Sequence, residues 1–405
     1  MSEPVLPKRV VFVCAAYLPR ITGVATAINA WARRLLPLGV RVTVVAPEHT
    51  SYTLYPLHSG PDELDIVRLP GEPAPFVLGI QRARAHGIAW EELLASLRGQ
   101  NAIVHGQDVH FAGKIAVQIG RRCRLPVMLH AHYPLWDSDP ADWLTFSPGM
   151  RGRRAVNAAI SGILARRARA TCRRANLIAA VSPYVQEMLA KCGVDNTVVL
   201  PCGVDPPADL PAVDIRRRHG IPQDSPIFLY TGRMDPDKRI GDLLEAAAIL
   251  HQREPRARLL LVGGGHYLER YLQRAEALRL GDTVVFAGWA SYQDIWAYYA
   301  QADLFLHANA HEAHGLVTIE AQAMGLPVVG YRGGGLALSV ADGKTGLLTD
   351  PTPQALAEAA LALHWNPQRR KAMSAAARAH AARYTSEQLF PSLLDAYARL
   401  SHGAA

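Results

Sequence analysis

Residues 312–320 read Glu-Ala-His-Gly-Leu-Val-Thr-Ile-Glu and join an apolar, strand-like run to a short helical stretch. A helix that begins near Gly315 presents unpaired N–H groups and partial positive charge, which suit a phosphate better than two acids. With a rise of about 1.5 Å per residue, Glu320 lies roughly 7 Å along that helix, near the distance from a diphosphate to its ribose. The pattern predicts that Glu320 binds one sugar of a larger ligand and that Glu312, before the helix, reaches a second sugar.

Short apolar runs alternate with helical stretches on both sides of this segment, which is typical of parallel sheets covered on both faces. The predicted strands are residues 10–14, 40–45, 102–105, 126–130, 177–181, 197–200, 227–231, 258–262, 283–287, 304–307 and 327–331. At 405 residues the chain exceeds the usual size of one domain. We therefore predict an α/β fold with two doubly wound, Rossmann-like domains that face each other across a cleft.

The boundary between the domains is expected at a proline-rich stretch, residues 206–226, which indicates a linker and the first helix of the second domain. The predicted domains are residues 1–206 and 207–385. A final segment, residues 386–405, has apolar residues at helical spacing and is expected to pack back on the first domain.

The composition is ordinary for a globular protein, with 19% charged and 49% hydrophobic residues. The five cysteines are scattered without metal-ligand spacing, which indicates reduced thiols in a cytoplasmic protein. The N-terminus lacks the apolar core of a signal peptide, and no stretch reaches the ~18 apolar residues of a membrane span. We therefore expect neither secretion nor a transmembrane helix.

Positive charge is concentrated in the first half of the chain. Residues 1–206 contain 23 Lys and Arg against 15 Asp and Glu, and the remainder contains 20 of each class, so the net charge of +8 lies in the first half. Between Trp136 and Arg174, aromatic residues precede a helical stretch with a basic and an apolar face, a combination that binds anionic membrane surfaces. The alternative is a helix packed on the sheet with a solvated basic face. No nucleic-acid recognition module is visible, so we expect no nucleic-acid partner.

Arg233 and Lys238 follow directly after the predicted strand 227–231, where a turn projects side chains toward a ligand. Arg offers a planar fork of donors and Lys a point charge, and both stabilise a phosphate that gains charge as a bond breaks. If this segment is considered alone, the alternative is that Arg233 and Lys238 are two solvated charges on a loop. Their position after a strand, together with the 312–320 segment, favours a diphosphate clamp.

Glycines follow several of the predicted strands. Gly263 and Gly264 allow the backbone to approach a ligand closely, with a tight turn as the alternative. Trp289 ends a later strand, where the ring and the adjoining backbone are placed to hold a nucleobase. Gly23 lies between the first strand and the first helix, where a phosphate fits the helix N-terminus. These glycines do not form G-x-G-x-x-G, which argues against a dinucleotide-dependent oxidoreductase.

His130 and His132 lie at the end of the predicted strand 126–130 and are expected to face the ligand. An imidazole there can bind a sugar hydroxyl or an acceptor, since histidine changes protonation near neutral pH. The alternative for one of them is a structural histidine. The candidate acceptor contacts are Tyr17, His130, Tyr133 and Trp136.

Taken in order, these features resemble the retaining glycosyltransferases of family 4, which have the GT-B fold. The resemblance covers nearly the whole chain. It rests on the Gly23 loop, His132, residues 201–205, residues 232–238, and above all Glu312 and Glu320 followed by residues 325–329.

The resemblance implies that the first domain binds the acceptor and the second binds a nucleotide sugar. Arg233 and Lys238 are then expected to hold the donor diphosphate, Glu320 the ribose, and Glu312 the transferred sugar. His132 is expected to touch that sugar and to assist transfer.

Further donor contacts are implied at His314, Gly315, Leu316 and Val317, with backbone N–H groups near the start of the helix. The sequence departs from the family's pattern at His314, where Phe is common, at Cys202, where Asn is common, and at Leu338, where an acid is common.

Two patterns suggest metal sites. Asp137-Ser138-Asp139 has the D-x-D form that binds a divalent ion in another class of sugar transferase, but it does not end a nucleotide-binding strand. His307, His311 and His314 span a strand end and a loop without a fixed helical register for zinc. We therefore expect no metal and no cofactor.

The family implies a metal-independent reaction that retains the anomeric configuration, in which the departing phosphate helps accept the proton of the attacking hydroxyl. We expect a hexosyltransferase that uses a UDP- or GDP-sugar, such as UDP-glucose or GDP-mannose, and a hydroxyl acceptor. Residues 19–27 and 132–148 look most like enzymes that glycosylate diacylglycerol or related lipids, which favours glycolipid biosynthesis by a cytoplasmic protein peripheral to the inner membrane face. A soluble small-molecule acceptor and a nucleotide-sugar-binding protein without transfer activity are the alternatives.

Overall fold

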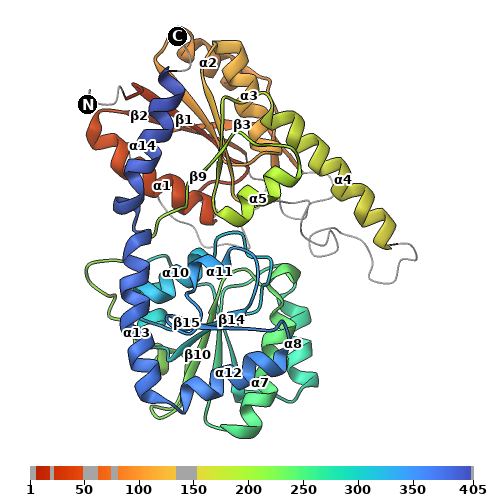
Figure 1. The fold of residues 1–405 in the computed structure, drawn as a ribbon, viewed down its shortest axis with the longest axis vertical. Coiled ribbons are helices and arrows are strands. Elements are labelled where there is room, and N and C mark those ends of the chain that lie inside the picture. Colours follow the sequence, from red (N-terminus) through yellow and green to blue (C-terminus); the bar gives the residue numbers. More distant parts are fainter. Residues whose placement is uncertain (1–5, 19–21, 49–62, 74–80, 134–152, 403–405) are drawn as a thin grey trace. The chain divides into compact units, whose positions relative to one another are not determined.

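The computed structural model describes residues 6–18, 22–48, 63–73, 81–133 and 153–402, and the chain divides into two compact units (Figure 1). Unit 1 comprises Met1–Gly203 and Ser386–Ala405, and unit 2 comprises Val204–Thr385. The divisions fall after residues 203 and 385, where the sequence analysis places them after residues 206 and 385.

Within the described part of unit 1, seven parallel strands form one sheet in the order β3-β2-β1-β6-β7-β8-β9. These strands are β1 (Arg9–Val13), β2 (Arg41–Pro47), β3 (Asp65–Leu69), β6 (Ala102–Gly106), β7 (Val127–Ala131), β8 (Leu177–Ala180) and β9 (Thr197–Val199). The helices are α1 (Gly23–Leu35), α2 (Ile88–Leu97), α3 (Phe111–Cys123), α4 (Arg153–Cys172), α5 (Pro183–Lys191) and α14 (Ser386–His402), and β4 (Gly71–Pro73) pairs with β5 (Gln81–Ala83) in a short antiparallel ribbon. The strand order reverses between β1 and β6, which is the topological switch point of this sheet.

The central strands of unit 1 are covered on both faces, so every residue of β1, β6 and β7 is buried. One core contains Phe12 of β1 and Trp31 of α1. The Thr22 side chain accepts a hydrogen bond from the Ala25 N–H at 3.1 Å and so caps α1. This cap fixes the point at which the loop after β1 becomes helix.

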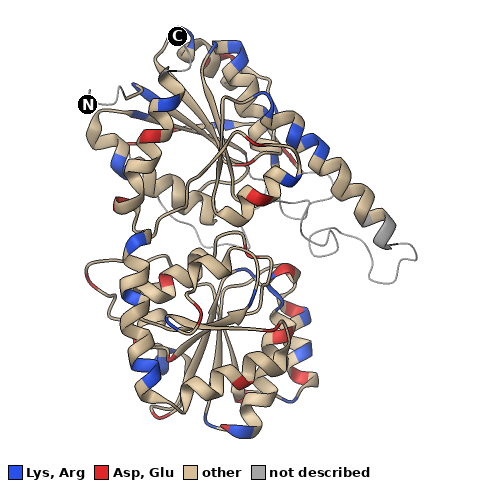
Figure 2. Cartoon of the chain, in the orientation of Figure 1, with Lys and Arg blue, Asp and Glu red and all other residues tan. Residues whose placement is uncertain are grey.

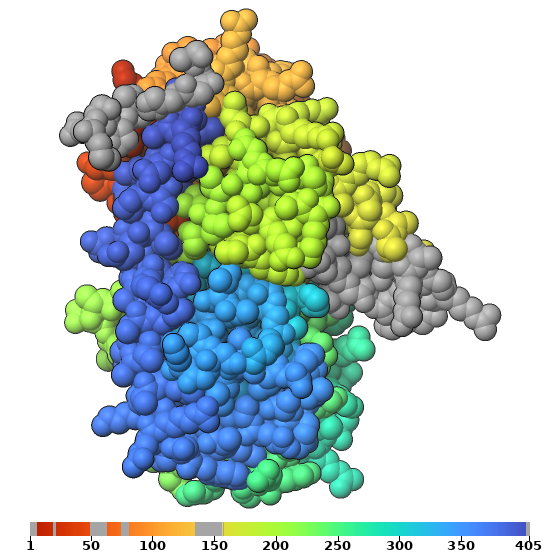
Figure 3. Space-filling view, viewed as in Figure 1, coloured from red at the N-terminus to blue at the C-terminus, as the bar shows by residue number. Residues whose placement is uncertain are grey.

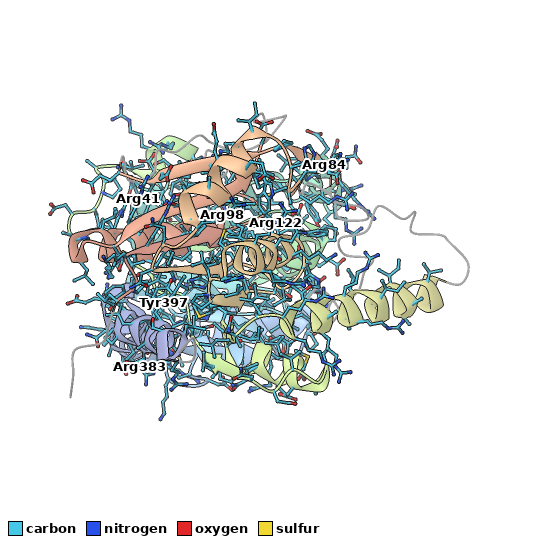
Figure 4. The ribbon with its side chains drawn as sticks, turned by 90° about the horizontal axis from the view of Figure 1, so that it is seen from above. Arg41, Arg84, Arg98, Arg122, Arg383 and Tyr397 are labelled. Atoms are coloured by element: carbon cyan, nitrogen blue, oxygen red, sulfur yellow. The ribbon has the colours of Figure 1, made fainter. Side chains whose placement is uncertain are left out.

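The C-terminal helix α14 belongs to unit 1 although it follows unit 2 in the sequence. Its apolar residues Leu393, Ala396, Tyr397 and Leu400 pack in the same core as β1 and α1. The Tyr397 hydroxyl lies 3.0 Å from Nδ1 of His105 in β6, and Figure 4 labels this tyrosine. The dark blue end of the chain runs over the outside of unit 1 (Figure 3).

Unit 2, which is described throughout, has six parallel strands in the order β12-β11-β10-β13-β14-β15. The strands are β10 (Ile227–Thr231), β11 (Arg258–Val262), β12 (Val284–Gly288), β13 (Leu304–His307), β14 (Val328–Tyr331) and β15 (Gly346–Thr349). The helices are α6 (Ile215–His219), α7 (Ile240–Arg253), α8 (Leu268–Ala277), α9 (Ile295–Gln301), α10 (Leu316–Ala323), α11 (Leu336–Ser339), α12 (Pro353–His364) and α13 (Pro367–Ala381). Short 3₁₀ turns cover Leu36–Leu38 in unit 1 and Pro236–Lys238, Gly281–Thr283 and Ala382–Tyr384 in unit 2. The strand order of unit 2 reverses between β10 and β13.

Alternate residues of β10 enter different cores. Phe228 and Tyr230 pack in one apolar cluster, and Ile227 and Leu229 pack in another. Because side chains of a strand point to opposite faces in turn, a strand covered by helices on both sides must be apolar throughout. This is why the buried strands read as continuous apolar runs.

The predicted α/β fold with two Rossmann-like halves is confirmed. The strands β3 and β15 and the β4–β5 ribbon were not predicted from the sequence. Both β3 and β15 lie at the edge of their sheets, and β3 reads Asp-Ile-Val-Arg-Leu with most residues only partly buried. Edge strands lack the continuous apolar run that identifies central strands. No helix among the described residues is long and apolar enough to cross a membrane.

Candidate functional site

Two loops meet at the switch point of unit 2, one after β10 and one after β13. Because these strands are parallel neighbours, their carboxyl ends lie at the same edge of the sheet. The first loop carries Arg233 and Lys238, and the second carries Glu312 and ends at Gly315, which precedes α10. The strand order therefore brings together the two segments that the sequence analysis singles out.

Lys238 and Glu312 form an ion pair across these loops, with 2.9 Å between Nζ and Oε2. Their side chains are only 16% and 14% exposed, so the pair is largely shielded from water. Glu312 Oε2 also lies 3.4 Å from Asn309 Nδ2 and 3.3 Å from Nε2 of the buried His307. Asp237 Oδ2 lies 3.5 Å from Lys238 Nζ and adds a second carboxylate to the lysine.

The ion pair sets the charge of both partners. Burial acts to raise the pKa of the Glu312 carboxyl, but Lys238 and the adjacent His307 outweigh it and hold that pKa well below its usual range. Burial likewise acts to lower the pKa of the Lys238 ammonium, and Glu312 and Asp237 raise it above its ordinary value. At neutral pH the site therefore holds a cation beside an acceptor-only carboxylate.

Glu320 lies on α10 and contacts a buried tyrosine. The Tyr299 hydroxyl donates to Glu320 Oε2 at 2.7 Å and lies 2.7 Å from Thr231 Oγ1 at the end of β10. Burial raises the pKa of the Glu320 carboxyl to about 7, with the Tyr299 hydrogen bond acting in the opposite direction. A carboxyl in this state becomes ionised when further donors, such as ribose hydroxyls, approach it.

Gly315 starts α10 in the left-handed region, at φ 76°. A Cβ there would lie 3.0 Å from Thr318 Oγ1 and 3.1 Å from Ser339 Oγ, so glycine lets the loop close tightly on the helix. Leu316 and Val317 form the first turn of α10, where amide N–H groups lack intrahelical acceptors. Amide N–H groups at the start of a helix point out of its N-terminal end, where they favour binding of an anion.

Arg233 lies beside Lys238 but is engaged with acidic neighbours. Its guanidinium pairs with Asp235 and lies 3.5 Å from Asp237 Oδ2. The side chain is 43% exposed, much more than that of Lys238. The basic residues of this loop were predicted from the sequence, but their contacts with Asp235 and Asp237 were not.

Gly263 and Gly264 follow β11 at a point where three loops pack together. A Cβ on Gly263 would lie 1.9 Å from the Gly232 carbonyl oxygen, and one on Gly264 would lie 2.7 Å from Nε1 of Trp289. Both positions require glycine because the loops after β10, β11 and β12 approach each other here. Packing thus explains the two glycines, and Trp289 covers the second of them.

The remaining predicted contacts of unit 2 have mixed surroundings. The His314 side chain is buried, and its ring centroid lies 6.3 Å from that of Tyr384. In the part of the chain that the structure describes, His307, His311 and His314 do not gather as metal ligands. Asp137 and Asp139 lie outside the described residues.

In unit 1, His132 follows β7, beside the strands of that unit's switch point. Its Nε2 lies 2.9 Å from Oε1 of Gln107, in the loop after β6, so Nε2–H donates to the amide oxygen and the ring orientation is fixed. The His130 and His132 rings lie 4.2 Å apart. His132 is half-buried, whereas His130 is fully buried.

Tyr17 and His130, which were expected to contact the acceptor, lie in the core of unit 1. Both are 0% exposed. The Tyr17 hydroxyl donates to Asn29 Oδ1 at 2.6 Å, and His130 Nε2 donates to the Leu200 carbonyl at 2.8 Å. Of the other residues expected in unit 1, Gly23 is the exposed first residue of α1, Tyr133 is half-buried and Trp136 lies outside the described residues.

Three residues of these sites, Asn309, Tyr299 and Gln107, were not singled out from the sequence, and His307 was considered only as a possible metal ligand. Their positions gave a usable signal for His307 and Asn309, because His307 ends β13 and Asn309 lies between that strand and Glu312. Tyr299 and Gln107 reach the site through tertiary packing, which the spacing of residues does not show.

Models of two glycosyltransferase families match this chain. The model described as "Glycosyltransferase Family 4" matches residues 21–207, and "Glycosyl transferases group 1" matches residues 213–380. The two matches together cover most of the chain.

Curated relatives match over different lengths. A D-inositol 3-phosphate glycosyltransferase of Thermomonospora curvata is 29% identical over 392 residues, 91% of this chain and 84% of that protein. One of Corynebacterium urealyticum is 39% identical over 193 residues, and the match spans about half of each chain, 46%. An alpha-monoglucosyldiacylglycerol synthase of Streptococcus pneumoniae is 25% identical over 326 residues, 78% of this chain and 69% of that protein.

A solved structure extends the comparison to the fold. HepE of Anabaena, in complex with UDP and glucose, has a TM-score of 0.73 at 20% identity, with 96% of this chain and 99% of that chain covered. With the family models and the two doubly wound sheets, this similarity identifies the architecture as GT-B. The chain belongs to the family 4 glycosyltransferases.

Proposed function

We propose that the protein transfers a hexose from a UDP- or GDP-sugar to a hydroxyl acceptor, with retention of the anomeric configuration and without a metal cofactor. The observation that carries this proposal is the meeting of Lys238, Glu312 and the start of α10 at the switch point of unit 2. A cation, a carboxylate and a helix N-terminus in one place offer separate contacts to a diphosphate and to its sugar.

Lys238 and α10 bind the diphosphate in this proposal. Lys238 Nζ carries three N–H donors, so it can keep its bond to Glu312 while it donates to a phosphate oxygen. Arg233, which is 43% exposed, turns from its neighbouring aspartates to the phosphate. As the bond to the sugar breaks, charge grows on the leaving phosphate, and these donors stabilise it.

The two carboxylates bind the two sugars of the donor. Glu320 accepts hydrogen bonds from the ribose hydroxyls, and Glu312 accepts them from the transferred hexose. Glu312 suits this role because Lys238 keeps it ionised, and an ionised carboxylate only accepts hydrogen bonds.

Transfer requires an acceptor hydroxyl and a place for its proton. The acceptor oxygen bonds to the anomeric carbon on the face that the nucleotide leaves, as the bond from that carbon to the phosphate oxygen breaks. The departing phosphate oxygen takes the hydroxyl proton. His132, oriented by Gln107, is proposed to contact the hexose during this step.

The acceptor is proposed to be a lipid that carries a hydroxyl group at an anionic membrane surface. Two relatives are named for a phosphorylated inositol and for a glucosylated diacylglycerol. In this chain, α4 extends away from the sheet of unit 1 (Figure 1) and carries Lys or Arg residues, coloured blue in Figure 2. Arg166, Arg167 and Arg169 of this helix are exposed. Ile163 on the same helix is 49% exposed. Arginines beside an apolar side chain bind an anionic lipid surface.

A product assay tests the reaction and its acceptor. The protein is incubated with UDP-glucose or GDP-mannose, and with diacylglycerol in phosphatidylglycerol vesicles or D-inositol 3-phosphate in solution. Glycosylated lipid supports the lipid acceptor, and glycosylated inositol phosphate supports the soluble alternative. If the protein binds the nucleotide but forms no product with these two acceptors or with any member of a wider acceptor panel, it is a binding protein without transfer activity.

Vesicle sedimentation tests the membrane surface separately. Changing Arg166, Arg167 and Arg169 together to Glu is expected to abolish salt-sensitive sedimentation with phosphatidylglycerol vesicles, because the arginines lose their attraction for the surface. The matched control changes Arg41, Arg98 and Arg122 to Glu, which alters the net charge by the same amount. These three arginines are exposed elsewhere in unit 1 and are labelled in Figure 4. Equal binding by both triple variants would contradict the role of α4.

A further inference from the structure

Two histidines and a cysteine of unit 1 form a cluster that the proposed reaction does not use as a whole. His130 ends β7, His132 follows it, and Cys202 lies in the turn after β9. One ligand atom from each residue lies within 4.8 Å of the other two. Cys202 Sγ and His132 Nδ1 are 3.7 Å apart.

Hydrogen bonds at the far side of each ring define which nitrogen can bind a metal. His130 Nε2 donates to the Leu200 carbonyl at 2.8 Å, and His132 Nε2 donates to Gln107 Oε1 at 2.9 Å. In a neutral imidazole the other nitrogen, Nδ1, then carries the lone pair. Metal-ligating histidines in proteins commonly have this arrangement, with the second N–H held by a carbonyl or carboxylate oxygen.

The turn that carries Cys202 is held firmly in place. A Cβ on the next residue, Gly203, would lie 2.4 Å from Cα of Ser386, so the turn packs directly against the start of α14. Cys202 and His130 are 0% exposed, and His132 is half-buried. Cys202 and His130 are therefore rigid ligands, and His132 is a third ligand that borders a more accessible region.

We propose that His130, His132 and Cys202 form a binding site for a thiophilic divalent cation, Zn²⁺, and that the ion removes His132 from glycosyl transfer when it binds. Zinc prefers imidazole and thiolate ligands, and its bond lengths of about 2.0 and 2.3 Å give a tetrahedral N–S edge of roughly 3.6 Å. The distance between Cys202 Sγ and His132 Nδ1 matches that edge. We expect the remaining separations, at most 4.8 Å between ligand atoms, to shorten on binding while the hydrogen bond from His132 to Gln107 is kept, with water as the fourth ligand.

Zinc binding must remove a proton from the cluster. The Cys202 Sγ–H bond breaks, the thiolate binds Zn²⁺ and the proton goes to solvent, while both imidazoles bind as neutral ligands. Because the thiol must lose this proton to bind the ion, the affinity for zinc is expected to rise with pH.

The effect on transfer rests on the proposed function, whereas the metal site does not. With Nδ1 bound to zinc and Nε2 bound to Gln107, His132 has neither nitrogen available for a sugar.

The test begins with metal-free protein titrated with Co²⁺ and then with Zn²⁺. A sulfur-to-cobalt charge-transfer band and the visible bands of tetrahedral Co²⁺ are expected, and Zn²⁺ should displace both. Cys202→Ser is expected to remove the charge-transfer band and to weaken Zn²⁺ binding at least about tenfold, since even outer-shell changes cost that much. Cys192→Ser removes a thiol outside the cluster and should preserve both signals.

His132→Asn gives a second variant that is expected to lose zinc binding, in case Cys202→Ser does not fold. Wild-type zinc binding by folded Cys202→Ser or by His132→Asn would overturn the proposed site. Transfer by the wild type is expected to fall with Zn²⁺, relative to its metal-free rate, and transfer by Cys202→Ser is expected to resist the ion. Unchanged transfer with the site occupied would overturn the inhibitory effect, and a protein that never transfers sugar would contradict the proposed function while the cobalt spectrum still decides the metal site.

Discussion

Lys238 and Glu312 are 74 residues apart in the sequence, yet they form a 2.9 Å ion pair between the loops that follow β10 and β13. The pair joins the two sides of the switch point in unit 2. Because both side chains are mostly buried, each charge depends on the other for compensation. The loops are thus held together before any ligand binds.

Lys238→Ala is expected to lower the free energy of unfolding by about 2–3 kcal/mol, because it leaves the Glu312 carboxylate buried without its cation. Urea denaturation of the full chain at pH 7 measures this loss. Lys371→Ala, at an exposed lysine of the same unit, should have little effect. Adding Glu312→Gln to Lys238→Ala should recover part of the loss, and equal stabilities of the Lys238 and Lys371 variants would contradict the structural role of the pair.

Glu320 is expected to make stability fall as pH rises. Its folded pKa of about 7 stands above the unfolded value near 4.5, so the folded state holds a proton between these pH values that the unfolded state has lost. The stabilisation is complete below about pH 4.5 and is lost as pH rises through 7, a change of about 3 kcal/mol. Relative to Glu320→Gln, the wild type should be more stable at pH 5 than at pH 8. An identical difference in urea midpoints at both pH values would contradict the raised pKa.

Nucleotide binding is expected to release the Glu320 proton below pH 7. Ribose hydroxyls donate to the carboxylate, which favours its ionised form and lowers the pKa in the complex. Titration calorimetry of UDP or GDP at pH 6 in two buffers of different ionisation enthalpy measures the proton released. The protons released when Glu320→Gln binds the nucleotide come from groups other than Glu320. Equal proton release by this variant and the wild type would argue against contact between Glu320 and the ribose.

His307 is expected to position Glu312 for the hexose. Its Nε2 lies 3.3 Å from Glu312 Oε2, and the shorter side chain of His307→Asn cannot reach that oxygen. This variant should lower kcat about tenfold, or 1.4 kcal/mol, with nucleotide affinity unchanged. His364→Asn is the matched control, because His364 Nε2 lies 3.6 Å from a glutamate, Glu254, away from the loops of the site. A similar kcat for both variants would remove His307 from the positioning residues.

The central elements of the fold were predictable from the sequence because β10, β11, β13 and β14 are buried on both faces and therefore read as apolar runs. The edge strand β3 was not predictable in this way, since Asp65 and Arg68 interrupt its pattern. The order in which the strands pair could not be predicted from the spacing of residues along the chain either. It depends on contacts between residues far apart in the chain.

The candidate site of unit 2 was predictable as two loops and only in part as a network. The positions of Lys238, Glu312 and Glu320 after strands and along a helix placed them near one ligand. Their mutual contacts, and the hydrogen bond from Tyr299, arise from packing between β10, α9 and α10. The position of His130 at a strand end does not reveal that its ring is buried and bound to a carbonyl.

Titration calorimetry with UDP and GDP tests the central claim most directly, that the switch point of unit 2 binds the nucleotide of a sugar donor. One of the two nucleotides should bind the wild type, and Lys238→Ala and Glu320→Ala should each weaken its binding at least about tenfold, or 1.4 kcal/mol. His132→Ala should bind it as tightly as the wild type and transfer sugar more slowly. Failure of the wild type to bind either nucleotide, or wild-type affinity in both the Lys238 and Glu320 variants, would contradict the claim.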